Sequence, residues 1–192
     1  MKKQIKNLVA NEIVITKSKF ITFLMPVNSL EETKQIIKEY NEKYRDATHV
    51  CYSYILDENT FKYYDDGEPS STAGAPIYQV LKNNDLVYTM CIVVRYFGGT
   101  KLGVGGLIKA YTNSALECLN KAIQIPYEKL FKYSLTCSYS VYEKLEYYLK
   151  QNSIQIVDKS FEEEIKIIIL INKNDLALLQ DQFQNCIEII TL

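Results

Sequence analysis

The chain has 192 residues, which is enough for one large domain or two small ones. Hydrophobic residues make up 47% of it and charged residues 23%, so it can bury a core and is not a disordered or collagen-like polymer. Lys and Arg number 22 against 23 Asp and Glu, a formal net charge of −1. This balance excludes the uniform basic field of a protein that coats nucleic acid, although it allows a local basic patch.

The sequence indicates neither a secretory signal nor a membrane-spanning segment. The lysines near the amino terminus precede no long apolar run, and no stretch approaches the ~18 uninterrupted apolar residues of a transmembrane helix. The five cysteines are odd in number, and no two of them form a CxxC or another close pair. This pattern is typical of reduced, mostly buried thiols rather than of disulfides or a zinc site. We therefore expect a cytoplasmic protein.

The first two thirds of the chain alternate between strand-like and helix-like patterns. Ser29 and Glu32 have the spacing of a capping box, and Pro76 suits the first turn of a helix. The predicted strands are 19–27, 48–56, 61–66 and 87–97, and the predicted helices are 29–44, 76–83 and 106–122. The last of these strands is so rich in apolar residues that we expect it to be buried on both faces.

Composition and charge change after Pro126. No glycine or proline follows it, and 15 basic against 13 acidic side chains in residues 1–127 give way to 7 against 10 in residues 128–192. We therefore predict two domains, 1–126 and 127–192, of the α+β class. The elements predicted for the second are strands at 132–139, 154–161, 164–171 and 186–192 and helices at 141–152 and 173–183. Their βαββαβ order is that of a ferredoxin-like domain, in which two helices cover one face of a four-stranded antiparallel sheet.

All seven glycines lie between residues 67 and 106, so we expect the functional site there. The loop at 65–76, DDGEPSSTAGAP, could hold a hard cation through Asp65, Asp66 and Glu68. The same residue types also build tight turns, and Ser71 or Thr72 could cap the helix that follows. The carboxylates lack the spacing of a calcium loop, so the sequence favours the turn.

The second segment, RYFGGTKLGVGGL at 95–107, is a glycine-rich turn between a buried strand and a helix. Such a turn exposes backbone N–H groups at the positive end of the helix dipole, where a phosphate or carboxylate binds, and Arg95 and Lys101 add charge. It is not a Walker A loop, because Val104 stands where lysine is required. Close packing of helix against strand also needs glycine, so the sequence leaves both interpretations open.

Few residues indicate catalysis. His49 is the only histidine, which excludes a multi-histidine metal site. It could act as a general base, but a lone histidine at the start of a strand is more often structural. Cys51, Ser70 and Ser71 are nucleophiles by type alone, since none lies in an activating motif.

DDGEPSSTAGAP, followed by VVRYFGGTKLGVGGLIKAY at 93–111, resembles the signature of the IMPACT/YigZ family. KSKF at 17–20 and ATHVCY at 47–52 extend the resemblance, which covers nearly the whole chain. Lys109 departs from the arginine expected there, which keeps the charge but loses forked hydrogen bonding, and Val50 stands where a polar residue is common.

The resemblance implies a first domain of the ribosomal-protein-type βαβ fold, as in the fourth domain of elongation factor G. The second domain then corresponds to the ferredoxin-like fifth domain of that factor, an order that suggests contact with ribosome or RNA. Eukaryotic members of the family act in translational control by binding a co-activator of a stress kinase, through an extra amino-terminal domain without a counterpart in this sequence.

The leading hypothesis is a non-catalytic, translation-associated regulator that binds RNA, ribosome or a translation factor through the glycine-rich surface, without cofactor, metal or membrane. The predicted binding residues are Asp65, Asp66, Glu68, Thr72, Arg95, Gly98, Gly99, Lys101, Gly103, Gly105, Gly106 and Lys109. The alternative is an enzyme acting on a small phosphorylated or acidic ligand, with His49, Asp66 or Glu68 as acid and base. A third possibility is a structural interaction module whose signature only maintains packing.

Overall fold

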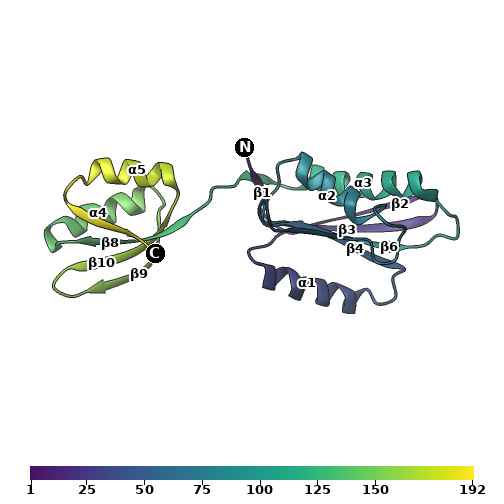
Figure 1. The fold of residues 1–192 in the computed structure, drawn as a ribbon, viewed down its shortest axis with the longest axis horizontal. Helices are drawn as coiled ribbons and strands as arrows, with labels where there is room; N and C mark the ends of the chain where they lie inside the picture. Colours follow the sequence, from purple (N-terminus) through teal and green to yellow (C-terminus); the bar gives the residue numbers. More distant parts are fainter. The chain divides into compact units, whose positions relative to one another are not determined.

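The computed structural model describes all residues from Met1 to Leu192, and they form two compact units, Met1–Tyr127 and Glu128–Leu192 (Figure 1). Each unit has a hydrophobic core of its own. The α+β class predicted from the sequence is confirmed, whereas the ribosomal-protein-type fold and the likeness to elongation factor G stay predictions. None of the helices has the length and apolar character that crossing a membrane requires.

A five-stranded antiparallel sheet forms the centre of the first unit. Its order is β2-β3-β6-β4-β5, and a separate two-stranded sheet pairs β1 with β7. The strands are β1 (Lys3–Ile5), β2 (Val9–Ile15), β3 (Ser18–Pro26), β4 (His49–Ile55), β5 (Phe61–Tyr64), β6 (Thr89–Tyr96) and β7 (Gln124–Pro126). The helices are α1 (Leu30–Lys43), α2 (Gly74–Asn83) and α3 (Gly103–Lys121).

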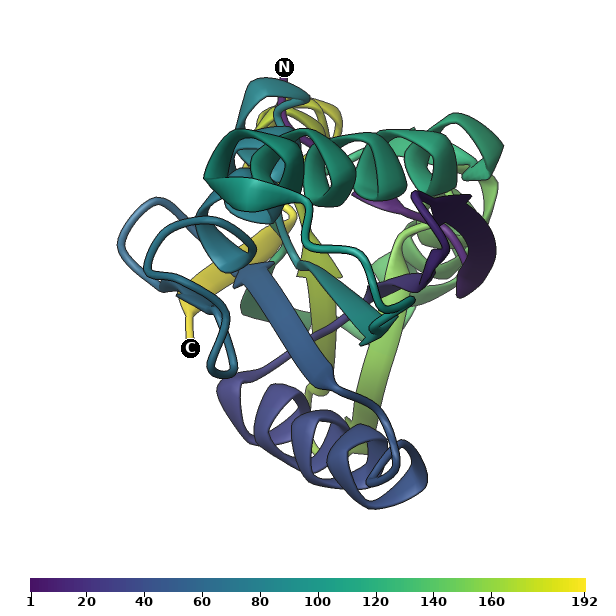
Figure 2. The same cartoon turned by 90° about the vertical axis from the view of Figure 1, so that its right-hand side faces the viewer.

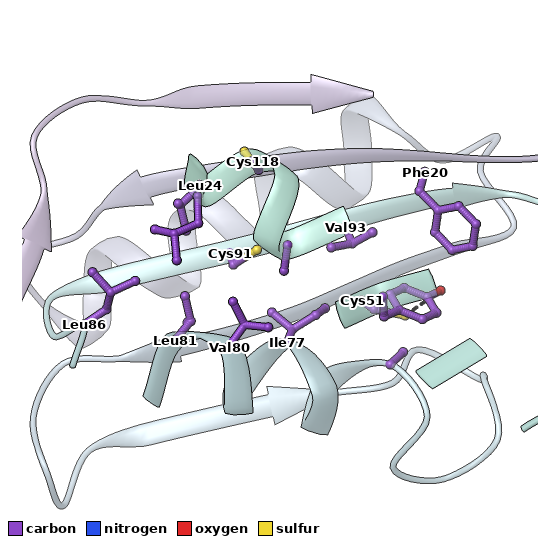
Figure 3. Packing of buried hydrophobic residues seen from close by; sticks show 14 of the residues in the cluster. Phe20, Leu24, Cys51, Ile77, Val80, Leu81, Leu86, Cys91, Val93 and Cys118 are labelled. Carbon is purple, nitrogen blue, oxygen red and sulfur yellow. Dashed lines mark hydrogen bonds between the residues drawn. The ribbon is translucent and has the colours of Figure 1, made fainter. Parts of the chain in front are cut away.

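Helices cover both faces of this sheet. Helices α2 and α3 lie on one face and α1 on the other, as both views show (Figures 1 and 2). Between the sheet and α2 and α3 lies the larger core, which includes Phe20, Ile77 and Cys91 (Figure 3). Every residue of β6 from Thr89 to Arg95 is buried, which confirms the prediction of a strand covered on both faces.

The local signals at the start of α1 are partly confirmed. The Ser29 hydroxyl accepts a hydrogen bond from the Glu32 amide at 3.1 Å, as a capping box requires. The Glu32 carboxylate accepts from the Asn28 amide at 2.6 Å instead of from the amide of Ser29. The second hydrogen bond of the capping box therefore comes from the residue before the N-cap rather than from the N-cap itself.

Three strands were not predicted from the sequence, and two helices begin earlier than predicted. Strands β1 and β7 are three residues long, and β2 mixes Asn11 and Glu12 with apolar residues. Helix α2 begins two residues earlier than predicted, and α3 begins at Gly103, three residues earlier. Glycine is a poor helix former, so the first turn of α3 carries no helical signal.

The second unit has the predicted ferredoxin-like topology. Its sheet has the order β11-β8-β10-β9, with all neighbours antiparallel. The elements are β8 (Phe131–Cys137), α4 (Tyr139–Gln151), β9 (Gln155–Phe161), β10 (Ile165–Ile171), α5 (Lys173–Gln182) and β11 (Ile187–Thr191). Alternate isoleucines of β10, at 165, 167, 169 and 171, are buried in the core, as expected for a sheet with helices on one face.

The cysteines are all free thiols, as the sequence predicted. Cys51, Cys91, Cys118 and Cys137 are buried, and Cys186 is exposed. Burial raises the pKa of each buried thiol, that of Cys118 to about 11, so these four are protonated and unreactive at neutral pH.

Candidate functional site

A cavity of about 380 Å³ lies in the first unit, where the loop at 65–76 meets the glycine-rich segment at 95–107. Its walls come from the start of β4, the loop between β5 and α2, the end of β6 and the start of α3. The residues that line it are Thr48, His49, Glu68, Pro69, Arg95, Phe97, Lys101, Leu102, Gly103, Val104 and Leu107.

Strand register explains why the charged side chains gather there. Arg95 on β6 lies directly opposite His49 on β4 and Phe20 on β3. Side chains directly opposite each other in a sheet share a face, so all three point to the side that α2 and α3 cover. The Arg95 guanidinium lies over the Phe20 ring, 5.5 Å from its centroid, and 5.7 Å from the ring of Phe97.

A buried ion pair joins two of the predicted binding residues. Arg95 is 4% exposed and Glu68 8% exposed, and Nη1 of Arg95 donates to Oε1 of Glu68 at 2.5 Å. The Tyr111 hydroxyl donates to the same oxygen at 2.7 Å. Nη2 of Arg95 lies 3.4 Å from the Ser18 hydroxyl, and its Nε has no hydrogen-bond partner. The ion pair with Glu68 thus balances the charge of Arg95 but uses only part of the five N–H donors of its guanidinium.

His49 is held in a fixed orientation at the cavity wall. Its Nδ1 lies 2.7 Å from the carbonyl oxygen of Asp66. Because a carbonyl oxygen only accepts, Nδ1 carries a proton. Nε2 then lies 3.7 Å from Oε2 of Glu68. The structure therefore brings together His49 and Glu68, two of the three acid–base candidates.

The other two carboxylates of the loop fold the backbone. Asp65 accepts hydrogen bonds from the amides of Ser71, Ala73 and Gly74 at 2.8 to 3.0 Å, so Asp65 caps α2. The prediction that Ser71 or Thr72 caps this helix is wrong, because the Thr72 hydroxyl donates to the carbonyl of Pro69 instead.

Asp66 binds the amide of Val50 at 2.7 Å through Oδ2. No three side chains of the metal-ligating types His, Cys, Asp and Glu converge anywhere in the chain. The carboxylates considered for a cation therefore have backbone amides and Arg95 as partners instead.

Five of the seven glycines fall into two groups. A Cβ at Gly98 would overlap the backbone of Lys17 and Ser18, and one at Gly74 would lie 2.5 Å from the Tyr64 nitrogen. These two are needed for close packing of backbone on backbone. Gly99, Gly103 and Gly105 meet nothing within 4 Å, and the first two have φ of +85° and +70°. They leave the backbone open at the start of α3.

The start of α3 has no side-chain cap. Its first residue is Gly103, the residue before it is Leu102, and no side chain accepts a hydrogen bond from its amides. Free amides at a helix start carry partial positive charge. Lys101 lines the same cavity and is exposed.

Not every predicted residue reaches the cavity. Glu68, Arg95, Lys101 and Gly103 line it. The remaining eight, which do not, are Asp65, Asp66, Thr72, Gly98, Gly99, Gly105, Gly106 and Lys109.

The apolar wall, which includes Phe97, Leu102 and Val104, was missed, because sequence reasoning sought charged groups and glycines. The sequence analysis also did not predict the hydrogen bond from the Tyr111 hydroxyl to Glu68. Helical spacing from Leu107 to Tyr111, which places both on one face of α3, was the available signal.

Two buried, weakly acidic groups, the Cys51 thiol and the Tyr111 hydroxyl, stay protonated at neutral pH. Burial raises the pKa of the Cys51 thiol and of the Tyr111 hydroxyl. Cys51 Sγ donates to the Asp65 carbonyl at 3.0 Å and contacts the Tyr111 hydroxyl at 3.5 Å. Cys51 is therefore not an activated nucleophile. Tyr111 keeps its proton and donates a hydrogen bond to Glu68.

Comparison with known proteins assigns the chain to a family. Residues 16–119 match the model of the Impact N-terminal domain, and residues 135–186 match that of a domain of unknown function, DUF1949. The IMPACT family member YvyE of Bacillus subtilis is 39% identical over 84% of this chain and 76% of its own length.

Two further proteins show the same relationship. The IMPACT family member YigZ of Escherichia coli is 34% identical over 77% of this chain and 74% of its own. A crystal structure described as that of a hypothetical protein superimposes with a TM-score of 0.73, at 26% identity, over 100% of this chain and 98% of that one. Because the signature loops, both domain matches and these relatives agree, the chain belongs to the IMPACT family.

Proposed function

We propose that this protein is a non-catalytic, translation-associated regulator that binds RNA through the surface around the cavity. The observation that carries the proposal is the uncapped start of α3 at Gly103, beside Lys101 and the open backbone of Gly99 and Gly105. Phosphate groups bind where free amides and a lysine lie together. Family membership supports the link to translation, because the resemblance to IMPACT proteins implies a role in translational control.

The chemistry of the buried groups favours binding over catalysis. Glu68 already receives two hydrogen bonds on Oε1, and Cys51 is protonated. A nucleophile or base needs a free lone pair within reach of a substrate. At the cavity wall, His49 Nε2 and Oε2 of Glu68, 3.7 Å apart, are left as such groups.

A salt series tests RNA binding. The purified chain is expected to bind RNA oligonucleotides with an affinity that falls as salt rises from about 50 to about 200 mM, since released counterions drive phosphate contacts. Lys101→Ala is expected to weaken binding of all RNA sequences. It is also expected to make the negative slope of log affinity against log salt shallower by about 1. Fluorescence anisotropy measures both.

Lys38→Ala is the matched control, because Lys38 is an exposed lysine of α1 on the other face of the sheet. It is expected to leave RNA binding unchanged. Absence of binding, binding that ignores salt, or equal effects of the two variants would contradict the proposal.

A second candidate is an enzyme that acts on a small phosphorylated or acidic ligand. The position of His49 Nε2 at 3.7 Å from Glu68 within the cavity favours it. It predicts that incubation with a panel of such compounds consumes one of them, as mass spectrometry detects, and that His49→Ala stops the consumption. If no compound is consumed, or if His49→Ala turns over as fast as the natural chain, this candidate fails.

A further inference from the structure

The lining of the cavity combines two chemistries. Lys101 and Gly103 offer a positive charge and a backbone amide, and Arg95, whose charge Glu68 balances, offers an unpaired N–H donor. Phe97, Leu102 and Val104 offer an apolar surface. Phe97 is 46% exposed and Val104 is 59% exposed, which is high for large apolar side chains. A site for bare phosphate has no use for such a surface, so its occupant has an apolar part as well.

Arg95 provides an observation independent of the helix start. It lines the cavity at 4% exposure, and its Nε finds no hydrogen-bond partner in the protein. A buried donor without a partner costs free energy, so native structures rarely keep one unless a water or ligand completes it. Its guanidinium also lies 5.7 Å from the centre of the Phe97 ring. Arg95 and Phe97 thus form a cationic and aromatic pair at the cavity.

The volume of the cavity limits the size of the ligand that it can hold. Ligand sites in proteins have volumes of about 300–1,000 Å³, and this cavity, at about 380 Å³, lies at the small end. It has room for one compact group and none for a helix or a duplex. Proteins that read single-stranded RNA extrude individual bases and stack them on aromatic rings or guanidinium planes.

We infer that the cavity receives a single unstacked nucleotide, an inference that rests on the RNA-binding function proposed above. The phosphate lies at Lys101 and the free amides of α3. The base lies against Phe97, whose ring has the Arg95 guanidinium beside it. Glu68, which also accepts a hydrogen bond from Tyr111, holds the Arg95 guanidinium in place.

Nucleotide fragments test the inference directly. Adenosine and uridine 5′-monophosphates are expected to bind more tightly than inorganic phosphate or the free nucleosides, as isothermal titration calorimetry measures. Phe97→Ala is expected to weaken both the monophosphates and single-stranded RNA by about tenfold or more, because stacking is lost. Phe97→Trp, which keeps an aromatic face, is expected to retain binding of both.

Phe61→Ala is the matched control, since Phe61 is exposed to a similar extent but lies on β5 away from the cavity. It is expected to bind like the natural chain. Circular dichroism of each variant shows that the fold is kept. If Phe97→Ala unfolds, Phe97→Leu takes its place and is expected to lose binding similarly.

The outcomes separate this inference from the function on which it rests. RNA binding that Lys101→Ala weakens but Phe97→Ala leaves unchanged overturns the nucleotide pocket and keeps the RNA-binding function. Inorganic phosphate that binds as tightly as the monophosphates also overturns the pocket. Monophosphates that bind while no RNA binds overturn both, because the ligand is then a free nucleotide.

Discussion

Replacement of Arg95 by methionine is expected to destabilise the first unit by about 3–5 kcal/mol. The substitution leaves the Glu68 carboxylate buried at 8% exposure with only Tyr111 donating to it and His49 nearby. A buried charge without its partner pays its full desolvation cost. Urea unfolding followed by circular dichroism measures the loss.

Two further variants identify the ion pair as the cause. Glu68→Gln combined with Arg95→Met removes both charges and is expected to recover part of the stability that Arg95→Met loses. Lys38→Met breaks an ion pair with Glu42 in which both side chains are more than 70% exposed, and it is expected to cost about 0.5 kcal/mol or less. An Arg95→Met variant as stable as Lys38→Met would show that the buried pair does not hold the loop at Glu68 in place.

Gly98→Ala is expected to lower stability by about 3 kcal/mol or more, because overpacking against backbone leaves no flexible side chain to move aside. The added Cβ would overlap the main chain of Lys17 and Ser18, where β2 turns into β3. Relief requires the strand ends to separate, which also breaks the bond from the Gly98 amide to the Ser18 hydroxyl. Thermal unfolding measures the effect.

Gly105→Ala provides the comparison within the same segment. Gly105 lies in the first turn of α3 with nothing near its Cβ position and no positive φ. Alanine there is expected to leave stability unchanged or to raise it by up to about 1 kcal/mol, since alanine favours a helix over glycine. Equal losses from the two substitutions would mean that Gly98 is not a packing glycine.

The contrast between these glycines marks how far the sequence could predict the site. The glycines within 67–106 belong to two segments that the structure brings together at the cavity, and the functional role predicted for them stays a prediction. It could not tell Gly98 from Gly105, because the neighbour that Gly98 contacts lies 80 residues earlier in the chain. Close approach between distant segments is set by the sheet, not by local pattern.

Arg95 and Glu68 show the same limit for charged residues. Both were predicted to bind a ligand directly, whereas they bind each other across 27 residues. Only the register of β6 against β4, which places Arg95 opposite His49, brings the loop carrying Glu68 over the guanidinium. The periodicity of each strand could be predicted from its residues, but the pairing of strands could not.

The second unit was easier to predict. Its elements follow one another in an order that few folds share, and burial alternates along β10. In the first unit, β1 and β7 pair across more than a hundred residues and are too short to show any period. Their formation depends on each other rather than on their own composition.

Only one of the five cysteines is exposed enough to be labelled from solvent. Only Cys186, which follows α5 in the second unit, presents its sulfur to solvent, while the four buried thiols lie within the two cores or at their edges. A maleimide dye at neutral pH therefore attaches at one known place without any cysteine being removed beforehand. The dye then marks the second unit alone and leaves the cavity of the first unit unmodified.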